Sequence, residues 1–307
     1  MTTRVKSLDF ESHIELEQIG PDTFTNVHPP WVFPITHTMP GPLMMAEATA
    51  AAYRTVTEDF RIDSLQVTFM LGPKTDRPLI YKVQRLSQGR TFVSRLVNIE
   101  QDDGRICVTV TASFVRATEW TGRSMTHTES MKTTERVGDI TLDDFEGDHT
   151  PLGPFMKFQR LPHLQLPEAN DPITTTIGPV VAKIDPPIKA PAGSQAHLLG
   201  IIYLSDYHIM DCPLRIHDIP LGLFPINDRT RTKQPASMKI MTSLNHAIHF
   251  HVHDGFRADE LVYVEATTPW AKDGRALIHS RIFSHKGLLI ATCVQEAFYV
   301  FKDNAKL

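Results

Sequence analysis

The chain has 307 residues, of which 41% are hydrophobic, and a formal net charge of −4 at pH 7. This length and apolar fraction allow a packed core in two domains or in one duplicated domain. The slightly acidic balance disfavours a nucleic-acid binder that depends on broad attraction to phosphates.

The first predicted helix covers residues 42–53, where Pro42 suits the first helical position after Gly41. It has almost no polar face, which predicts a buried helix. Strand patterns follow, separated near their end by a turn at Asp102-Asp103-Gly104. They cover residues 65–69, 79–86, 91–99 and 106–114. One buried helix followed by antiparallel strands predicts an α+β unit in which the helix lies across the sheet.

The middle of the chain is rich in Ser, Thr, Asp, Glu and Gly and sustains no period, which is typical of a linker. A second apolar helix is predicted at 195–206. Strands are predicted at 173–183, 240–252, 260–268, 275–284 and 288–301. We therefore expect an N-terminal unit at 1–118, a linker at 119–165 and a C-terminal unit at 166–307 that carries the catalytic residues.

The two units share a spacing between a turn glycine and the strand that follows it. Ala112 lies eight residues after Gly104, and Gln295 lies eight residues after Gly287. This spacing pairs a polar residue of the second unit with an apolar residue of the first. The pattern predicts a duplication in which one copy kept the chemistry.

Three polar residues of the second unit stand where apolar ones are expected. Asp206 ends the buried helix, Ser243 begins a strand, and Gln295 interrupts an apolar strand. A buried carboxylate needs hydrogen-bonding partners to stay charged. A hydroxyl and a carboxamide are suitable partners, and together the three side chains can hold a water whose proton the carboxylate accepts. The alternative is a polar network that only joins helix to sheet.

Other patterns give weaker signals. His249, His251 and His253 alternate along one strand face but lack a carboxylate as a further metal ligand, so we expect no metal site. Neither a dinucleotide-binding motif, nor a P-loop, nor a nucleophile elbow is present. No run approaches 18 apolar residues, so no membrane-spanning helix is expected.

The cysteines indicate a reducing compartment. Cys107, Cys212 and Cys293 are odd in number, far apart and surrounded by apolar residues. We expect them to be buried free thiols rather than a disulfide framework or a zinc site.

Short motifs in both halves resemble the acyl-CoA thioesterase II family, which includes peroxisomal acyl-CoA thioesterases. In the second half they are Tyr203-Leu-Ser-Asp206, Ser243-Leu-Asn-His246, Phe250-His251, Phe256-Arg-Ala-Asp259, Pro269-Trp270, Gly274-Arg275 and Val294-Gln295-Glu296. In the first half they are Phe60-Arg61, Asp76-Arg-Pro78, Tyr81, Gly89-Arg90 and Phe92. The resemblance covers most of the chain outside the linker.

The resemblance implies a double hotdog fold, with two antiparallel sheets each wrapped around a long buried helix. It implies hydrolysis of an acyl-CoA thioester to a free acid and CoA, with the family's catalytic Asp, Ser or Thr, and Gln falling on Asp206, Ser243 and Gln295. Neither a metal nor an organic cofactor is needed. The alternatives are a hotdog dehydratase or hydratase acting on an acyl thioester, and a non-catalytic acyl-CoA-binding protein.

The chain departs from the family pattern at two places. The usual Phe-Gly-Gly-Gln before the first helix is replaced by Pro40-Gly41-Pro42-Leu43, and the Asp of Asp-His is replaced by Asn245. The first change lies where a helix commonly faces acyl or CoA groups, so it bears on substrate choice. The second is expected to alter the support of the site.

Two further expectations concern partners and location. Because hotdog units expose sheet edges and commonly pair, we expect a homo-oligomer. Ala305-Lys306-Leu307 resembles the tripeptide address that a peroxisomal import receptor reads. Peroxisomal location is therefore expected, with the cytoplasm as the alternative.

Overall fold

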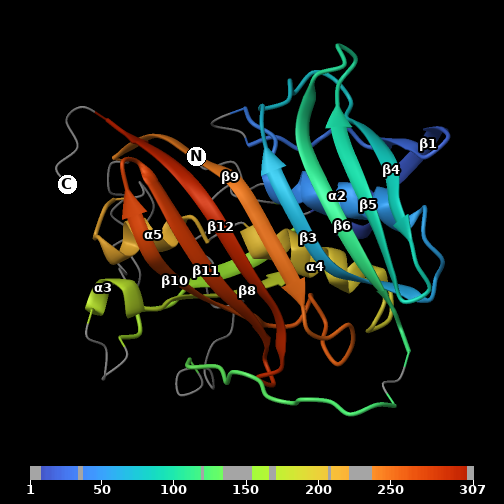
Figure 1. Cartoon of the computed structure of the whole chain (residues 1–307). Coiled ribbons are helices and arrows are strands. Elements are labelled where there is room, and N and C mark those ends of the chain that lie inside the picture. Colours follow the sequence, from blue (N-terminus) through green and yellow to red (C-terminus); the bar gives the residue numbers. More distant parts are fainter. Residues whose placement is uncertain are drawn as a thin grey trace.

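The computed structural model of the chain describes residues 8–33, 37–118, 121–133, 154–165, 171–206, 209–220 and 237–302. In chain order, its elements are α1 (Phe10–His13), β1 (Leu16–Gly20), β2 (Thr23–Asn26), α2 (Gly41–Tyr53), β3 (Phe60–Phe69), β4 (Ile80–Gln88), β5 (Phe92–Glu100), β6 (Ile106–Arg116), β7 (Met156–Arg160), α3 (Pro172–Thr175), β8 (Gly178–Ile184), α4 (Gln195–Asp206), α5 (Asp211–Ile216), β9 (Met238–Phe250), β10 (Val262–Lys272), β11 (Arg275–Ser284) and β12 (Leu289–Phe301). The strands of these ranges form a 12-stranded antiparallel sheet in the order β1-β2-β4-β5-β6-β3-β9-β12-β11-β10-β8-β7 (Figure 1).

A strand pair at the centre of the sheet joins the two halves of the chain. β3 pairs antiparallel with β9, and Gln66 lies opposite Ala247 at the middle of the paired stretch. The expectation of two separate sheets is therefore wrong: the described strands form one continuous sheet. Each of these strands would otherwise be the edge of its own half, and their pairing satisfies backbone N–H and C=O groups that an edge leaves free.

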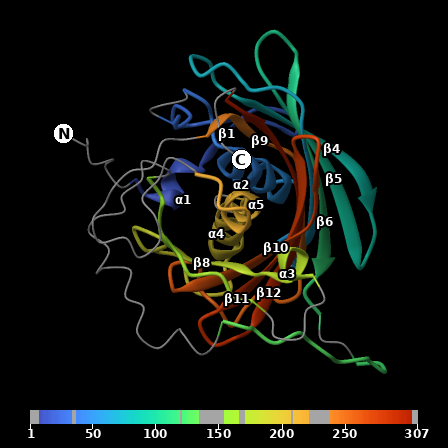
Figure 2. The ribbon, with the colours of Figure 1, turned by 90° about the vertical axis from the view of Figure 1, so that its left-hand side faces the viewer.

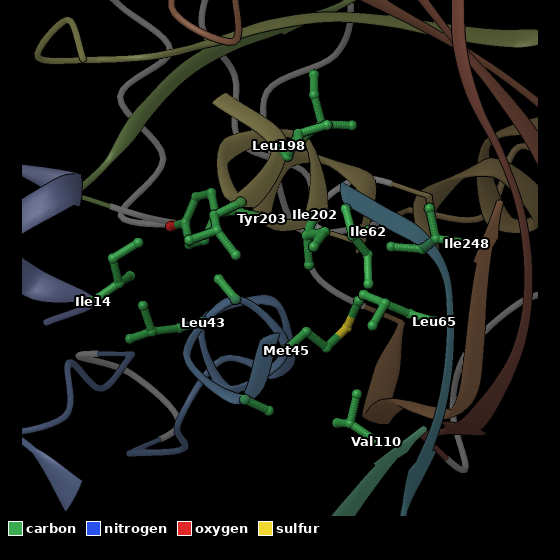
Figure 3. Packing of buried hydrophobic residues seen from close by; sticks show 14 of the residues in the cluster. Ile14, Leu43, Met45, Ile62, Leu65, Val110, Leu198, Ile202, Tyr203 and Ile248 are labelled. Atoms are coloured by element: carbon green, nitrogen blue, oxygen red, sulfur yellow. The ribbon is translucent and has the colours of Figure 1, made fainter. Parts of the chain in front are cut away.

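The two long helices lie side by side on the concave face of the curved sheet (Figure 2). Figure 3 shows Met45 of α2 extending toward Leu65 of β3, with Ile202 of α4 on the side of its helix that faces α2. Each helix packs against its neighbour as well as against the sheet, which explains why neither has a polar face. The predicted burial of both helices is confirmed.

The sequence prediction is less accurate in the connecting segments. The strand expected at 173–183 begins only at Gly178, because Asp171 caps the short helix α3 by accepting the Ile173 N–H at 3.0 Å. The predicted linker contains β7, which pairs with β8. Its sequence, Met-Lys-Phe-Gln-Arg, is short and too polar to stand out as a strand.

Part of the linker region is anchored to the sheet by a buried acid. Oε1 of Glu265 on β10 accepts the backbone N–H groups of Lys132 and Thr133 at 2.6 and 2.8 Å. Met131 packs nearby into a small apolar cluster with Tyr263 and Phe283. This described part of the linker is therefore attached to the second half of the sheet.

The expectation for the cysteines agrees with the structure. Cys107, Cys212 and Cys293 are buried free thiols. In the part of the chain that the structure describes, no helix is long and apolar enough to cross a membrane.

Candidate functional site

Three elements of the second half bring the predicted residues together. Asp206 is the last residue of α4, Ser243 lies in β9 and Gln295 lies in β12. Residues an odd number apart on a regular strand point to opposite faces. The pairing of β9 with β12 shifts register between Glu296 and Ala297. This irregularity puts Ser243 on the same buried face as His246, three residues further on.

The three side chains form one hydrogen-bonded cluster. The Ser243 hydroxyl donates to Oδ1 of Asp206 at 3.1 Å, and Nε2 of Gln295 donates to Oγ of Ser243 at 2.6 Å. The same Nε2 also donates to Oδ1 of Asp206. Asp206, Ser243 and Gln295 are all buried. The expected convergence of these residues is therefore present, with the carboxylate as the common acceptor.

Burial changes the acidity of Asp206. Removing the carboxyl from water raises its pKa from 3.8 to about 6, although the hydrogen bonds from Ser243 and Gln295 act in the opposite direction. The group is therefore mostly ionised at neutral pH. A carboxylate with this pKa is a stronger base than an exposed one.

The other carboxylate oxygen faces the first half of the chain. A Cβ added at Gly41, the first residue of α2, would lie 3.3 Å from Oδ2 of Asp206 and 3.0 Å from Cε1 of Phe69. No side chain caps this helix end, where the N-cap is Pro40. The first turn of a helix has backbone N–H groups without intrahelical partners and a partial positive charge. The site therefore lies between the end of α4 and the start of α2.

A fourth polar residue, His246, extends the cluster. It is 1% exposed, and its Nε2 lies 3.0 Å from Oγ of Ser205 on α4. Burial lowers the pKa of His246 to about 4, so the imidazole is neutral at physiological pH. In the sequence, His246 stands out only as the last residue of the Ser243-Leu-Asn-His246 motif. Its place directly opposite Gln295 depends on strand register, which the sequence alone does not specify.

The alternating histidines have separate partners. His251 Nε2 lies 3.1 Å from Oγ1 of Thr292, and His253 Nε2 lies 2.8 Å from the carbonyl oxygen of Ile62. His249 is exposed. Among the residues that the structure describes, no group of three or more His, Cys, Asp or Glu side chains is arranged to hold a metal ion.

The departure at Asn245 does not contact the site. Its Nδ2 donates to Oε2 of Glu296 at 3.1 Å, and its Oδ1 accepts the Glu296 N–H at 3.3 Å. A carboxylate at this position would face the carboxylate of Glu296. The side chain of Asn245 therefore bonds to its cross-strand neighbour Glu296, which follows Gln295 in β12, and its effect on the support of the site stays a prediction.

A cavity of about 320 Å³ lies near the cluster, between α5 and the end of the sheet. Its lining combines apolar side chains and the ring of Tyr299 with the charged residues Lys272, Asp273 and Arg275. Tyr299 donates its hydroxyl to the Met210 carbonyl at 2.8 Å, and Sδ of Met210 lies 3.4 Å from Oγ of Ser243. Met210 therefore contacts both Tyr299, which lines the cavity, and Ser243 of the carboxylate cluster.

Two family models match the chain. One, described as an acyl-CoA thioesterase N-terminal domain, matches residues 28–115, and the other, described as an acyl-CoA thioesterase C-terminal domain, matches residues 183–299. Together they cover about two thirds of the chain. The second match contains Asp206, Ser243 and Gln295.

Curated and solved proteins are similar over nearly the full length. Acyl-coenzyme A thioesterase 8 of Mus musculus is 25% identical over 95% of this chain and 89% of its own. The structure of acyl-CoA thioesterase II TesB2 from Mycobacterium marinum aligns with a TM-score of 0.72 at 23% identity, covering 96% of this chain and 99% of that one. A conserved protein with a hot dog fold from Alicyclobacillus acidocaldarius aligns with a TM-score of 0.62 at 16% identity, covering 95% and 98%. The fold is therefore of the hotdog type.

Proposed function

We propose that this chain, which belongs to the acyl-CoA thioesterase family and hydrolyses acyl-CoA thioesters, does so with a water held by Asp206, Ser243 and Gln295. The observation that carries the proposal is the cluster in which one buried carboxylate accepts hydrogen bonds from a hydroxyl and a carboxamide. A network that only joined helix to sheet would have no need of an ionisable group at its centre, because burying a charge is costly.

In the proposed reaction, Asp206 accepts a proton from the bound water while the water oxygen attacks the thioester carbonyl carbon. Ser243 and Gln295 orient this water and hold the carboxylate. The tetrahedral intermediate then collapses, breaking the carbon–sulfur bond. Asp206 returns its proton to the departing sulfur, which leaves CoA as a thiol and the acyl group as a carboxylic acid. The raised pKa of Asp206 suits a base that works near neutral pH.

The start of α2 is the proposed site for the negative charge that develops on the carbonyl oxygen. Gly41 lies against Asp206, and no side chain makes a capping hydrogen bond at the start of this helix. Backbone N–H groups at a helix start stabilise an oxyanion through hydrogen bonds and the helix dipole. The departure Pro40-Gly41-Pro42-Leu43 keeps glycine at a position where an added Cβ would lie 3.3 Å from Oδ2 of Asp206.

The dehydratase or hydratase alternative expects a histidine paired with the carboxylate. His246 instead contacts Ser205, and Asp206 is bonded to Ser243 and Gln295. This arrangement favours water activation over proton transfer between a His–Asp pair.

A thiol-release assay over acyl-CoA substrates of increasing chain length tests the proposed site. Replacing Gln295 with alanine is expected to lower kcat by about 10²-fold, because the water and carboxylate lose their orientation. The matched control is Gln66→Ala, which removes an exposed glutamine from β3. If both variants hydrolyse acyl-CoA at the same rate, the proposed site is contradicted, although the thioesterase activity itself is not.

Three finer features remain proposals. We infer a double hotdog, with units at 1–118 and 166–307 around α2 and α4, because both halves repeat the order of a buried helix followed by antiparallel strands.

We also propose a homo-oligomer, since β1 and β7 are the edges of the described sheet. Light scattering of the purified protein tests the oligomer, and a monomeric mass would contradict it.

Peroxisomal import stays a proposal from sequence. Its basis is the tripeptide Ala305-Lys306-Leu307, which lies outside the described residues. A fluorescent fusion that carries the tripeptide at its C-terminus should enter peroxisomes, and deletion of Leu307 should leave it in the cytosol. A fusion that is diffuse with the tripeptide intact would contradict the proposal.

A further inference from the structure

Two buried polar side chains face each other behind the proposed site. Gln295 on β12 and His246 on β9 are opposite each other in the strand register. Both are essentially inaccessible to solvent, and both reach the end of α4, one at Asp206 and the other at Ser205. Their contacts therefore bind two strands to the same turn of the helix.

Each of these side chains has one polar atom left over. Nε2 of Gln295 donates to Asp206 and Ser243, and Nε2 of His246 contacts Ser205. Within the described residues, Oε1 of Gln295 and Nδ1 of His246 are buried without a hydrogen-bond partner. Such atoms are rare, because an unsatisfied buried polar group destabilises the fold. The two residues are directly opposite each other on β12 and β9, which places their Cβ atoms about 5 Å apart and brings the side chains within reach of each other.

We propose that His246 is a positioning residue that fixes the amide orientation of Gln295. Its Nδ1–H donates to Oε1 of Gln295, and its Nε2 accepts the hydroxyl proton of Ser205. The amide nitrogen of Gln295 is thereby kept toward Asp206 and Ser243. This inference rests on the proposed function, because it assigns a support to the same site.

Two proton arrangements satisfy Ser205, and one of them also satisfies Oε1 of Gln295. A neutral imidazole has one N–H and one acceptor nitrogen. Oγ of Ser205 lies 3.0 Å from His246 Nε2 and 2.8 Å from the carbonyl oxygen of Ile202, and its single proton serves one of them. If Nε2 carried the ring proton, the bare Nδ1 would face the carbonyl oxygen of Gln295, and two acceptors would repel. Rotating the amide would instead bring that oxygen against the Asp206 carboxylate.

Two substitutions separate the roles of the ring nitrogens. Asparagine places an amide nitrogen near the position of Nδ1, whereas glutamine reaches the position of Nε2. We expect His246→Gln to lower kcat by about 10²-fold with little change in KM, and His246→Asn to stay within about 5-fold of wild type. The matched control is His249→Gln, on the exposed face of the same strand.

A pH profile distinguishes positioning from general destabilisation. The hydrogen bond from Gln295 lowers the pKa of Asp206, so its loss raises that pKa. The acid limb of kcat/KM is therefore expected to move to higher pH in His246→Gln and to stay in place in His246→Asn. In a Gln295→Ala background, His246→Gln should lower kcat little further, because both changes act through one group. Thermal unfolding shows whether each variant is folded.

The nitrogen chemical shifts of ¹⁵N-labelled histidine in the intact enzyme report the tautomer directly. The proposal expects protonated Nδ1 at His246, and a protonated Nε2 would overturn it. It would also be overturned by a folded His246→Gln enzyme with wild-type kcat and an unmoved acid limb. If Nε2 of His246 is protonated or His246→Gln behaves as wild type while Gln295→Ala is inactive, only the positioning role of His246 is contradicted. If Gln295→Ala is fully active, the proposed site itself fails.

Discussion

The phenol oxygen of Tyr53 accepts the backbone N–H of Ile62 at 2.9 Å. Tyr53 is the last residue of α2, just as Asp206 is the last residue of α4. Ile62 directly precedes a register shift in β3, and Ser243 directly precedes one in β9. The contact between Tyr53 and Ile62 in the first half therefore corresponds in position to the contact between Asp206 and Ser243 in the second half.

The residue of the first half that corresponds to Gln295 is Ala112, which is apolar. Ala112 pairs with Leu65 in the first half, as Gln295 pairs with His246 in the second. The first half therefore keeps the framework of the site while Tyr53, Ile62 and Ala112 fill its interior. These residues agree with the expectation from spacing that one copy kept the polar groups.

This assignment predicts that Tyr53→Phe affects stability and leaves catalysis unchanged. The substitution keeps the ring that packs at 4.9 Å from Phe114 but leaves the buried Ile62 N–H without an acceptor. We expect a loss of about 1–3 kcal/mol in the free energy of unfolding, with kcat/KM unchanged. Denaturant unfolding and the thiol-release assay measure the two quantities, and a selective loss of activity would count against the assignment.

The main features of the fold follow from local patterns. Residues 42–53 and 195–206 are apolar on all sides, and the structure has helices there because each contacts both the sheet and the other helix. The strand ranges follow from alternation of apolar and polar residues. The single sheet could not be predicted in this way, since the pairing of Gln66 with Ala247 joins residues far apart in the chain.

Only part of the site could be predicted from the sequence, because the rest depends on how the strands pair. Asp206 and Gln295 stand out because each is polar within an apolar element. The inward direction of Ser243 depends on a strand irregularity, and the position of His246 against Gln295 depends on register. Both are tertiary features that residue periodicity does not specify.

The raised pKa of Asp206 predicts an acid limb in the activity profile. The carboxylate must be unprotonated to accept a proton from water, and burial raises its pKa to about 6. Below that pH, kcat/KM should fall about tenfold for each pH unit. Initial rates of thiol release measured from pH 4 to pH 9 check this, and full activity at pH 4.5 would exclude Asp206 as the base.

The first half contains a separate pH-dependent group, Glu47 on α2. Burial raises its pKa from 4.5 to about 8, and it accepts the hydroxyl proton of Tyr81. The folded protein therefore holds this proton more tightly than the unfolded chain does. The contribution of protonated Glu47 to the free energy of unfolding is fully present below pH 4.5. It is lost as pH rises through 8, by up to about 1.4 kcal/mol per pH unit.

Glu47→Gln should remove that loss, because the amide does not ionise. The difference in unfolding free energy between Glu47→Gln and wild type is expected to increase with pH up to about 8. Urea unfolding at several pH values measures it, and parallel curves for the two proteins would contradict the assignment.

The close approach of Gly41 to the site predicts the effect of adding a methyl group. In Gly41→Ala, the new Cβ would lie 3.0 Å from Cε1 of Phe69 and 3.3 Å from Oδ2 of Asp206, so the ring or the carboxylate must shift. We expect kcat to fall by about 10- to 100-fold. Gly72→Ala is the control, since a Cβ there has nothing within 4 Å. Similar kinetics in both variants would show that the start of α2 is not close to the reaction.

The most direct test of the central claim is the kcat of Asp206→Asn in the thiol-release assay. The substitution keeps the shape of the side chain but removes the base, and kcat should fall by about 10²–10⁴-fold. It also removes a buried charge, so at pH 8 the variant should be at least as stable as wild type, by up to about 3 kcal/mol. A folded, stable Asp206→Asn enzyme that releases CoA at the wild-type rate would contradict the account.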